Sequence, residues 1–232
     1  MKTNFAEYCN EQLKSNRQNI IKELNFVKNK MKGRICYESS LKVGQASPFI
    51  IYLLNNYFKS IGKEFSSYLE IGSLYGGSLC CLAHSGFKGT AYSCDIFSGY
   101  YGDFKDPFFP NDAERSHEGH MKVVSDNVSS FNSDLDLIMI RGSSLDVQFQ
   151  ESIDSKGIKE LDVLYIDGLH TEEGCSADWN LYNKFVKKGG MVLVDNVEMS
   201  GVRESIEKVI WPSGLLEELG VWYNSTWIAI KK

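Results

Sequence analysis

Apolar side chains recur every three or four positions in the first part of the chain, among many Lys, Asn and Glu residues. Between residues 4 and 32 this spacing predicts one or two amphipathic helices. A further helix is expected over residues 48–58, because Ser47 is a suitable N-cap and a proline follows it at the first helical position. We therefore expect residues 1–60 to form an N-terminal helical extension of the same domain.

From residue 66 onward, short apolar runs alternate with helical stretches. The runs are apolar at consecutive positions, which is typical of strands buried on both faces of a parallel sheet. Alternation with helices indicates an α/β fold. Gly189-Gly190 is expected to end the last crossover helix. Strands are expected at 68–71, 91–94, 135–140, 163–166 and 191–194, and helices near 77–85, 112–130, 146–154 and 173–187.

The last part of the chain predicts a different strand pairing. A helix over 201–210 precedes two apolar runs, at 215–223 and 226–230, which Asn224-Ser225 separates. Such a short polar connection favours a hairpin, so we expect an antiparallel hairpin at the end of the parallel sheet. Residues 61–232 should thus form a single α/β domain.

Composition and charge narrow the range of functions. At 232 residues the chain fits one substantial domain, and its net charge of −5 without a basic cluster argues against a nucleic-acid partner. The N-terminus is polar and no segment is apolar over the length that a membrane span requires, so we expect a cytoplasmic protein. Six cysteines without C-x-x-C spacing predict reduced, buried thiols rather than disulfides or a zinc site.

The first predicted strand runs into a glycine-rich loop, Glu70-Ile71-Gly72-Ser73-Leu74-Tyr75-Gly76-Gly77-Ser78. In an open α/β sheet, ligands bind at the carboxyl ends of the strands, so this loop is a candidate nucleotide site. The dinucleotide pattern G-x-G-x-x-G is incomplete, because Leu74 occupies the position of the second glycine. The alternative is a tight turn without a ligand.

Asp95 ends the second predicted strand, at a distance downstream that suits hydrogen bonds to ribose hydroxyls. The alternative is a helix cap or a loop acid. Ribose binding by itself leaves both S-adenosylmethionine (SAM) and NAD open as the nucleotide.

Acidic and amide side chains follow the fourth and fifth predicted strands. Asp167 ends the fourth, and Asp195-Asn196 ends the fifth. Two carboxylates and an amide oxygen are hard ligands that suit Mg²⁺ or Ca²⁺. His170 lies three residues past Asp167 and is a candidate general base. The alternatives are a helix cap or turn at Asp167, and an orienting or substrate-binding role for His170.

These features together resemble class I SAM-dependent methyltransferases, in particular metal-dependent O-methyltransferases of the catechol and macrocin types. The resemblance covers about residues 40–232 and is most specific over 165–196. It implies a Rossmann-like α/β fold with a mostly parallel, seven-stranded sheet and a C-terminal antiparallel hairpin. It also implies SAM contacts from Glu70, Gly72, Ser73, Tyr75, Gly76, Ser78, Asp95, Ser143 and Asp167.

The same resemblance implies the chemistry of the site. Asp167, Asp195 and Asn196 match the positions that hold Mg²⁺ in the family, and Asp167 and His170 are the implied catalytic residues. A divalent ion lowers the pKa of a bound hydroxyl and orients it toward the methyl group of SAM. Several macrocin-type enzymes carry an acid where this chain has Leu169, so the identity of the base stays open.

Residues 97–110 hold six aromatic side chains together with glycines and prolines. Aromatic rings over a cofactor site stack on sugar or aryl groups or close as a lid. Tyr100 and Tyr101, with His117 on the following helix, are therefore candidate substrate residues. The run 99–102 resembles loops of methyltransferases associated with bacterial sugar polymers and glycosylated natural products, which favours a glycosyl hydroxyl as acceptor. The alternative is a loop packed on the domain or on a partner subunit.

The sequence thus predicts a SAM-dependent, Mg²⁺-assisted O-methyltransferase that acts on a hydroxylated small molecule. Three alternatives stay open: an NAD-type oxidoreductase, a protein similar to cephalosporin hydroxylases, and a non-catalytic SAM-binding protein. The apolar positions of the N-terminal helices have no evident place in the core, which favours a homodimer.

Overall fold

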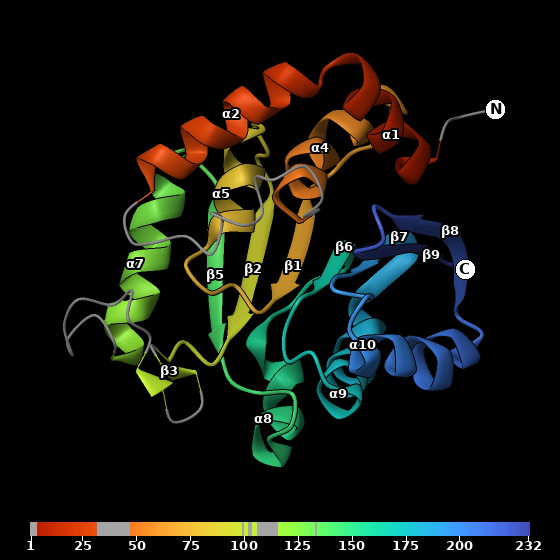
Figure 1. Cartoon of the computed structure of the whole chain (residues 1–232). Helices are drawn as coiled ribbons and strands as arrows, with labels where there is room; N and C mark the ends of the chain where they lie inside the picture. The colour runs from red at the N-terminus through yellow and green to blue at the C-terminus, as the bar shows by residue number, and fades with distance from the viewer. Residues whose placement is uncertain (1–3, 32–46, 99, 102–103, 106–115, 133) are drawn as a thin grey trace.

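The computed structural model describes residues 4–31, 47–98, 100–101, 104–105, 116–132 and 134–232. Its main sheet has seven strands in the order β5-β2-β1-β6-β7-β9-β8, of which the first five are parallel and the last two pair antiparallel (Figure 1). The expected mostly parallel sheet with a C-terminal hairpin is confirmed. The strands are β1 (Ser67–Ile71), β2 (Thr90–Asp95), β5 (Asp136–Arg141), β6 (Leu161–Ile166), β7 (Val186–Val194), β8 (Leu216–Trp222) and β9 (Thr226–Lys231), with β3 (Tyr100–Tyr101) and β4 (Phe104–Lys105) paired separately.

Helices cover both faces of the sheet (Figure 1). One face is covered by α1 (Phe5–Ser15), α2 (Arg17–Lys30), α4 (Ser47–Ser60), α5 (Gly77–His84) and α7 (His117–Ser129). The other is covered by α8 (Val147–Ser152), α9 (Glu172–Tyr182) and α10 (Ser200–Ser205). Single turns of 3₁₀ or π helix extend several of these elements, namely η1 (Ile153–Lys156), η2 (Asn183–Phe185), η3 (Ile206–Ile210) and η4 (Trp211–Ser213).

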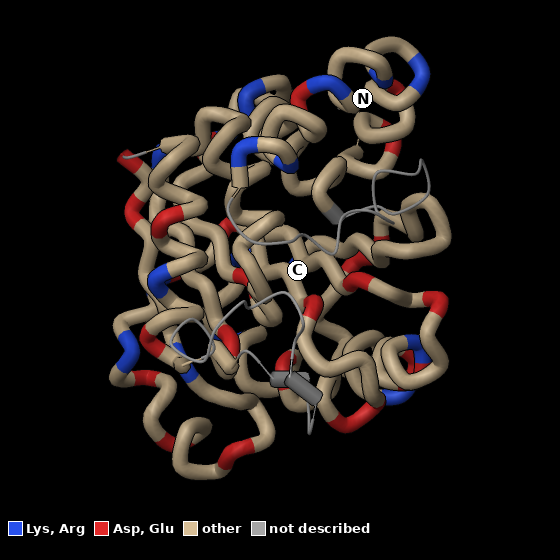
Figure 2. Tube along the Cα trace, turned by 60° about the vertical axis from the view of Figure 1, so that its left-hand side comes forward, with Lys and Arg blue, Asp and Glu red and all other residues tan. Residues whose placement is uncertain are grey.

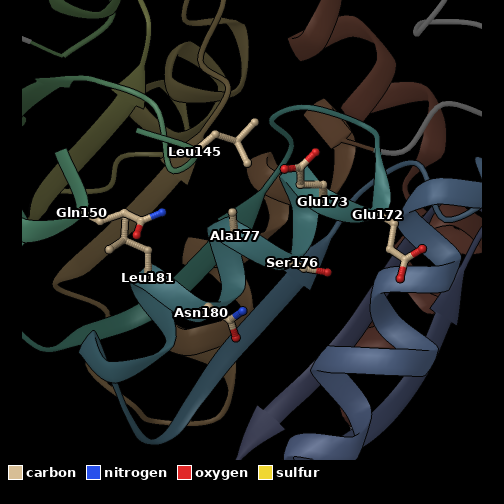
Figure 3. Close-up of a pocket in the computed structure, with 8 residues that line it drawn as sticks. All are labelled: Leu145, Gln150, Glu172, Glu173, Ser176, Ala177, Asn180 and Leu181. Carbon is tan, nitrogen blue, oxygen red and sulfur yellow. The ribbon is translucent and has the colours of Figure 1, made fainter. Parts of the chain in front are cut away.

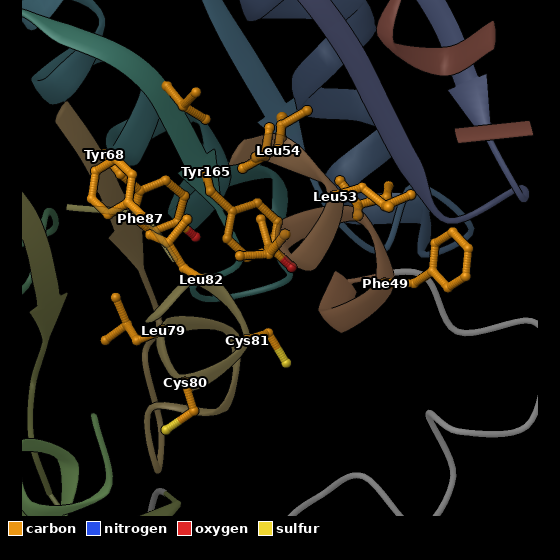
Figure 4. Packing of buried hydrophobic residues seen from close by; sticks show 14 of the residues in the cluster. Phe49, Leu53, Leu54, Tyr68, Leu79, Cys80, Cys81, Leu82, Phe87 and Tyr165 are labelled. Atoms are coloured by element: carbon orange, nitrogen blue, oxygen red, sulfur yellow. The ribbon is translucent and has the colours of Figure 1, made fainter. Parts of the chain in front are cut away.

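The central strands send alternate side chains to the two faces of the sheet. In β6, Val163 and Tyr165 lie in one core cluster, and Leu164 and Ile166 lie in the other. Because both faces are buried, the strands are apolar at consecutive positions, as the sequence pattern indicated. Figure 4 shows the first of these clusters, in which side chains of α4 and α5 pack near Tyr68 and Tyr165.

Parallel pairing aligns the carboxyl ends of four neighbouring strands. Ile71 of β1 is paired with Cys94 of β2 and with Ile166 of β6. Ile166 is in turn paired with Val194 of β7. The residues that follow these four positions therefore lie at one edge of the sheet, where α/β proteins bind their ligands.

The N-terminal helices belong to the main core. Phe5, Cys9, Ile20, Leu24 and Val27 are all buried in the cluster that covers one face of the sheet. The expectation that these apolar positions lack a place in the core is therefore wrong. Their burial within the chain removes the observation that favoured a homodimer.

Two glycines expected to end a helix lie instead inside a strand. Gly189-Gly190 are part of β7, since the crossover helix ends several residues earlier. A Cβ at Gly190 would lie 2.8 Å from the carbonyl oxygen of Lys187, so the close backbone packing of this strand requires glycine.

The hairpin between β8 and β9 is confirmed, and Tyr223 and Asn224 in its turn both have a left-handed φ of 55°.

The described cysteines are reduced, as predicted. Cys9, Cys80, Cys81, Cys94 and Cys175 are buried and form no disulfide. Cys36 lies outside the described residues.

The surface of the described chain carries both signs of charge. Figure 2 shows Lys and Arg interspersed with Asp and Glu over the described elements. None of the described helices is long and apolar enough to cross a membrane.

Candidate active site

Gly72 directly follows β1, and its lack of a side chain allows the carboxyl ends of β1 and β6 to lie close together. Its φ is +86°, and a Cβ built on it would lie 2.0 Å from the carbonyl oxygen of Asp167. Its N–H donates to the carbonyl oxygen of Cys94 over 2.9 Å. No side chain fits between β1 and β6 at this point, so Gly72 is required by packing as well as by conformation.

Beyond Gly72, the glycine-rich loop adopts the left-handed backbone conformation that glycine normally takes. Leu74 has a left-handed φ of 46°, and its N–H donates to Oδ2 of Asp95 over 3.0 Å. Oδ1 of the same carboxylate accepts the N–H of Phe97 over 2.8 Å. Gly76, with a φ of +77°, is the residue before α5. Asp95 thus links the loops that follow β1 and β2.

Glu70 is fully buried beneath this loop. Its Oε2 accepts hydrogen bonds from the hydroxyls of Tyr68, at 2.8 Å, and Ser78, at 2.7 Å, while Oε1 has no hydrogen-bond partner among the described residues. Burial raises the pKa of the Glu70 carboxyl from 4.5 to about 7, although the two hydroxyls favour the ionised form. A cationic group reaching this carboxylate would stabilise its charge.

Other predicted cofactor residues surround the same edge. The hydroxyl of Ser73 is buried and accepts a hydrogen bond from Ser93 over 2.6 Å. The ring of Tyr75 is buried in the core, so only its backbone is near the loop surface. Ser143 follows β5 and its hydroxyl accepts the N–H of Leu145 over 3.2 Å.

Two carboxylates meet at the hydroxyl of Tyr165. This hydroxyl lies 3.1 Å from Oδ2 of Asp167 and 3.0 Å from Oδ2 of Asp195. The other oxygen of Asp195 accepts hydrogen bonds from Ser225, at 3.2 Å, and Thr226, at 2.6 Å. The hairpin of β8 and β9 thereby holds Asp195 in place, through a contact between residues 30 and 31 positions apart that no local sequence pattern predicts.

Asn196 follows Asp195 with a left-handed φ of 59°. Asn is one of the few residues other than glycine that adopts this conformation readily. Its Nδ2 donates to Oε1 of Glu198 over 3.3 Å. The left-handed conformation at Asn196 keeps its side-chain amide at the carboxyl end of β7, next to Asp195.

The donor set of Asp167, Asp195 and Asn196 fits a divalent cation. A hydroxyl carries one proton, so Tyr165 donates to only one of the two carboxylates at a time. Burial raises the pKa of the Asp167 carboxyl to about 6, and the charge of Asp195 adds to this. A cation between the carboxylates would remove their repulsion. In the part of the chain that is described, no three His, Cys, Asp or Glu side chains converge as metal ligands, and the third donor here is an amide oxygen.

His170 lies beside Asp167. Its Nε2 is 3.2 Å from Oδ1 of Asp167, and this hydrogen bond raises the pKa of His170. The side chain is about one-third exposed, at 34%, so it is reachable from the strand-end edge. The structure therefore places the predicted base beside Asp167, which shares the Tyr165 hydroxyl with Asp195.

The predicted substrate residues are only partly described. Tyr100 and Tyr101 form the short strand β3, and their side chains lie outside the described part of the structure. His117 is the first residue of α7, and its Nδ1 is 2.8 Å from the carbonyl oxygen of Phe97. The ring thus contacts the loop after β2, a partner that the sequence did not reveal.

Three exposed apolar residues lie at the same edge, and none of them was among the residues that the sequence pattern predicted for the site. Ile96, Leu145 and Leu169 are 50%, 41% and 56% exposed and lie in the loops after β2, β5 and β6. Large apolar side chains exposed to water at the ligand-binding edge of a sheet are suited to contact the apolar part of a ligand. The signal was present in the sequence, since Ile96 directly follows the strand-end acid and Leu169 follows another by two residues.

A pocket of about 700 Å³ opens between α8 and α9. Leu145 and Gln150 line one side, and residues of α9, among them Glu173 and Ala177, line the other (Figure 3). Apart from Leu145, it includes none of the strand-end residues described above. The convergent carboxylates and the glycine-rich loop, rather than this pocket, define the candidate active site.

Comparison with known proteins identifies a family. Residues 69–197 match the sequence model of a family described as a methyltransferase domain. A comparison with curated proteins finds no match.

Solved structures share the fold. The O-methyltransferase NovP superposes with a TM-score of 0.62 at 16% identity, covering 93% of this chain and 97% of NovP. An O-methyltransferase from Bacillus cereus in complex with SAH gives 0.59 at 18% identity, covering 92% and 91%. The O-methyltransferase TomG from Streptomyces achromogenes in complex with SAM gives 0.51 at 15% identity, covering 90% and 89%. At these identities the likeness shows the shared fold.

Replacing Gly72 by alanine should destabilise the protein far more than the same change at Gly157. Both residues have positive φ, but a Cβ at Gly157 meets nothing within 4 Å. The clash with Asp167 should add about 1–3 kcal/mol to the conformational cost that both variants share. The free energies of unfolding in urea measure this difference, and equal losses would show that the strand ends separate freely.

Replacing Glu70 by glutamine should flatten the dependence of stability on pH. Because burial raises the folded pKa to about 7 from 4.5, protonated Glu70 contributes stability that is complete below pH 4.5 and is lost as the pH rises through 7. The total is roughly 3 kcal/mol. Glu70→Gln should therefore gain stability relative to the wild type between pH 5 and pH 8, as measured by melting temperature without ligand. Parallel curves would contradict the raised pKa.

Proposed function

The chain belongs to the methyltransferase family whose sequence model it matches, and we propose that it transfers a methyl group from SAM to a hydroxyl oxygen of a small molecule. The observation that carries this proposal is the meeting of Asp167 and Asp195 at one hydroxyl, directly beside the glycine-rich loop. A site for a divalent cation next to a nucleotide loop suits the activation of a hydroxyl for transfer.

SAM would lie over the carboxyl ends of β1, β2, β5 and β6. In this proposal Asp95 binds the ribose, and Ile96, Leu145 and Leu169 contact the adenine. The amino-acid part, with its ammonium group, reaches toward Glu70. The remaining contacts come from Gly72, Ser73, Tyr75, Gly76, Ser78, Ser143 and Asp167.

Leu74 supplies an argument against NAD. A dinucleotide loop needs free backbone N–H groups that approach the pyrophosphate. Here the N–H of Leu74 is already bonded to Asp95, and its side chain occupies the place of the second glycine. The oxidoreductase alternative therefore lacks the contact that its cofactor would require.

Asp167, Asp195 and Asn196 would hold the divalent ion, which we propose is Mg²⁺. When bound, such an ion lowers the pKa of the acceptor hydroxyl and holds its oxygen toward the donor methyl group. Tyr165, Ser225 and Thr226 orient the two carboxylates through the hydrogen bonds described above.

His170 would accept the proton of the acceptor hydroxyl at its Nδ1, because its Nε2 donates to the carboxylate of Asp167. As the new C–O bond forms, the C–S bond of the sulfonium breaks, and S-adenosylhomocysteine (SAH) leaves as a neutral thioether. The carboxylate of Asp167 stabilises the protonated imidazole, as their hydrogen bond indicates. Holding donor and acceptor together in one site would make the transfer effectively unimolecular.

For the acceptor we propose a hydroxylated small molecule. TomG, one of the proteins of similar fold, is involved in tomaymycin synthesis, which is consistent with that class. A glycosyl hydroxyl is the acceptor that the run 99–102 favours. Tyr100, Tyr101 and His117 would contact it from the loop and helix that follow β2.

Isothermal titration calorimetry of the whole chain tests the cofactor. We expect saturable binding of SAM and SAH and no heat from NAD, because the loop lacks the pyrophosphate contact. Binding of NAD alone would overturn the proposal. Binding of SAM without methyl transfer to any of a panel of sugars and phenols, with Mg²⁺ present, would favour a non-catalytic SAM-binding protein.

Replacing Asp195 by asparagine should weaken the binding of a divalent ion by tenfold or more, because one of two carboxylate ligands loses its charge. Electron paramagnetic resonance of Mn²⁺ in the presence of SAH measures this directly. The matched control is Asp154→Asn, which removes a carboxylate that is 75% exposed and pairs with Lys184. Equal Mn²⁺ affinity in both variants would contradict the metal site.

A further inference from the structure

Two non-glycine residues beside the proposed cofactor site have left-handed backbones. Leu74 has a φ of 46° in the loop after β1, and Phe97 has a φ of 45° in the loop after β2. This conformation is unfavourable for residues with a Cβ, and it persists only where the surroundings hold it. The contacts that hold these two residues are therefore informative.

Each of the two residues is bonded on both sides of its backbone. The N–H groups of Leu74 and Phe97 donate to the two oxygens of Asp95, at 3.0 and 2.8 Å. The carbonyl oxygens of Leu74 and Phe97 accept hydrogen bonds from two histidines at the start of α7. Nε2 of His120 is 2.6 Å from the oxygen of Leu74, and Nδ1 of His117 is 2.8 Å from the oxygen of Phe97.

The geometry fixes the proton on each ring. A carbonyl oxygen only accepts, so Nε2 of His120 and Nδ1 of His117 must carry hydrogen. His120 is 1% exposed, and its ring meets that of Phe97 edge-on, with centroids 5.7 Å apart and planes at 88°. Asn127, two turns further along α7, donates to the carbonyl oxygen of Tyr75 over 3.1 Å. One helix thus holds two consecutive carbonyls of the glycine-rich loop.

The position of α7 agrees with this role. Figure 1 shows its first turn at the end of the molecule toward which β1 and β2 point, close to β3. The helix therefore holds the carbonyl oxygens of two residues whose N–H groups are held by Asp95. Removal of the histidines would leave the carbonyl oxygens of both left-handed residues without these hydrogen bonds.

On the basis of the proposed function, we propose that His117 and His120 are positioning residues that preorganise the cofactor site. By holding the carbonyls of Leu74 and Phe97, they keep both N–H groups on Asp95 and so fix that carboxylate where the ribose binds. A loop that is already ordered loses less entropy when the cofactor binds. The histidines therefore act on cofactor affinity and on the KM for SAM.

His117 is the better site for the test, because it is exposed and its replacement does not open the core. His117→Ala removes the donor, whereas His117→Asn places an amide N–H close to the position of Nδ1. Lys122→Ala is the matched control, since Lys122 is an exposed residue of the same helix whose partner is Asp126.

Calorimetry with SAH, without metal or acceptor, gives the readout. We expect His117→Ala to weaken SAH binding by about fivefold, the effect of one lost hydrogen bond, and His117→Asn to restore it to within about twofold. Lys122→Ala should bind like the wild type. Equal SAH affinity in wild type and His117→Ala overturns the inference and leaves the proposed function intact.

Hydrogen exchange of the ligand-free protein tests the geometry separately. In His117→Ala the amide of Phe97 should exchange faster than in the wild type. In His120→Leu the amide of Leu74 should exchange faster as well. In His120→Gln, which retains an N–H near the position of Nε2, the amide of Leu74 should stay protected. Unchanged exchange in His117→Ala and His120→Leu overturns the inference, whereas a wild type that binds neither SAM nor SAH overturns the proposed function and this role with it.

Discussion

The close approach of β1 and β6 at their carboxyl ends is the constraint on which the rest of the site depends. The carbonyl of Asp167 lies where a side chain at position 72 would stand, so only glycine permits these strands to end side by side. The left-handed loop that continues to Leu74 and the burial of Glu70 below it accompany this contact. The parallel register then brings β7 and its acid to the same edge.

The electrostatics of this edge explain its chemistry. Glu70 and Asp195 are buried and the side chain of Asp167 is 26% exposed, and desolvation raises the pKa values of Glu70 and Asp167. Such a cluster is unfavourable while it is empty of cations. Both proposed ligands would relieve it, because Mg²⁺ and the sulfonium and ammonium groups of SAM all carry positive charge. In the proposed function, the carboxylates would thus select positively charged partners.

The sequence was sufficient for those features that depend on local pattern. Consecutive apolar runs and strand-end acids located the sheet, the glycine-rich loop and the set of Asp167, Asp195 and Asn196, because parallel strands place their ends together. Features that depend on tertiary contact were missed. The glycines at 189–190 lie within a strand because of packing on neighbouring backbone, and the apolar positions of α1 and α2 fit a core surface formed by distant segments. The contact of His117 with Phe97 joins residues 20 positions apart.

The most direct test asks whether the methyl group of the cofactor lies beside the metal site, because this needs no knowledge of the acceptor. SAM labelled with ¹³C at its methyl group is added to the protein, and Mn²⁺ is titrated in place of Mg²⁺ while the methyl resonance is recorded. We expect strong paramagnetic broadening of the bound methyl signal in the wild type, and its loss in Asp195→Asn. A bound methyl signal that stays sharp with Mn²⁺ present would contradict a metal-assisted methyl transfer at this edge of the sheet.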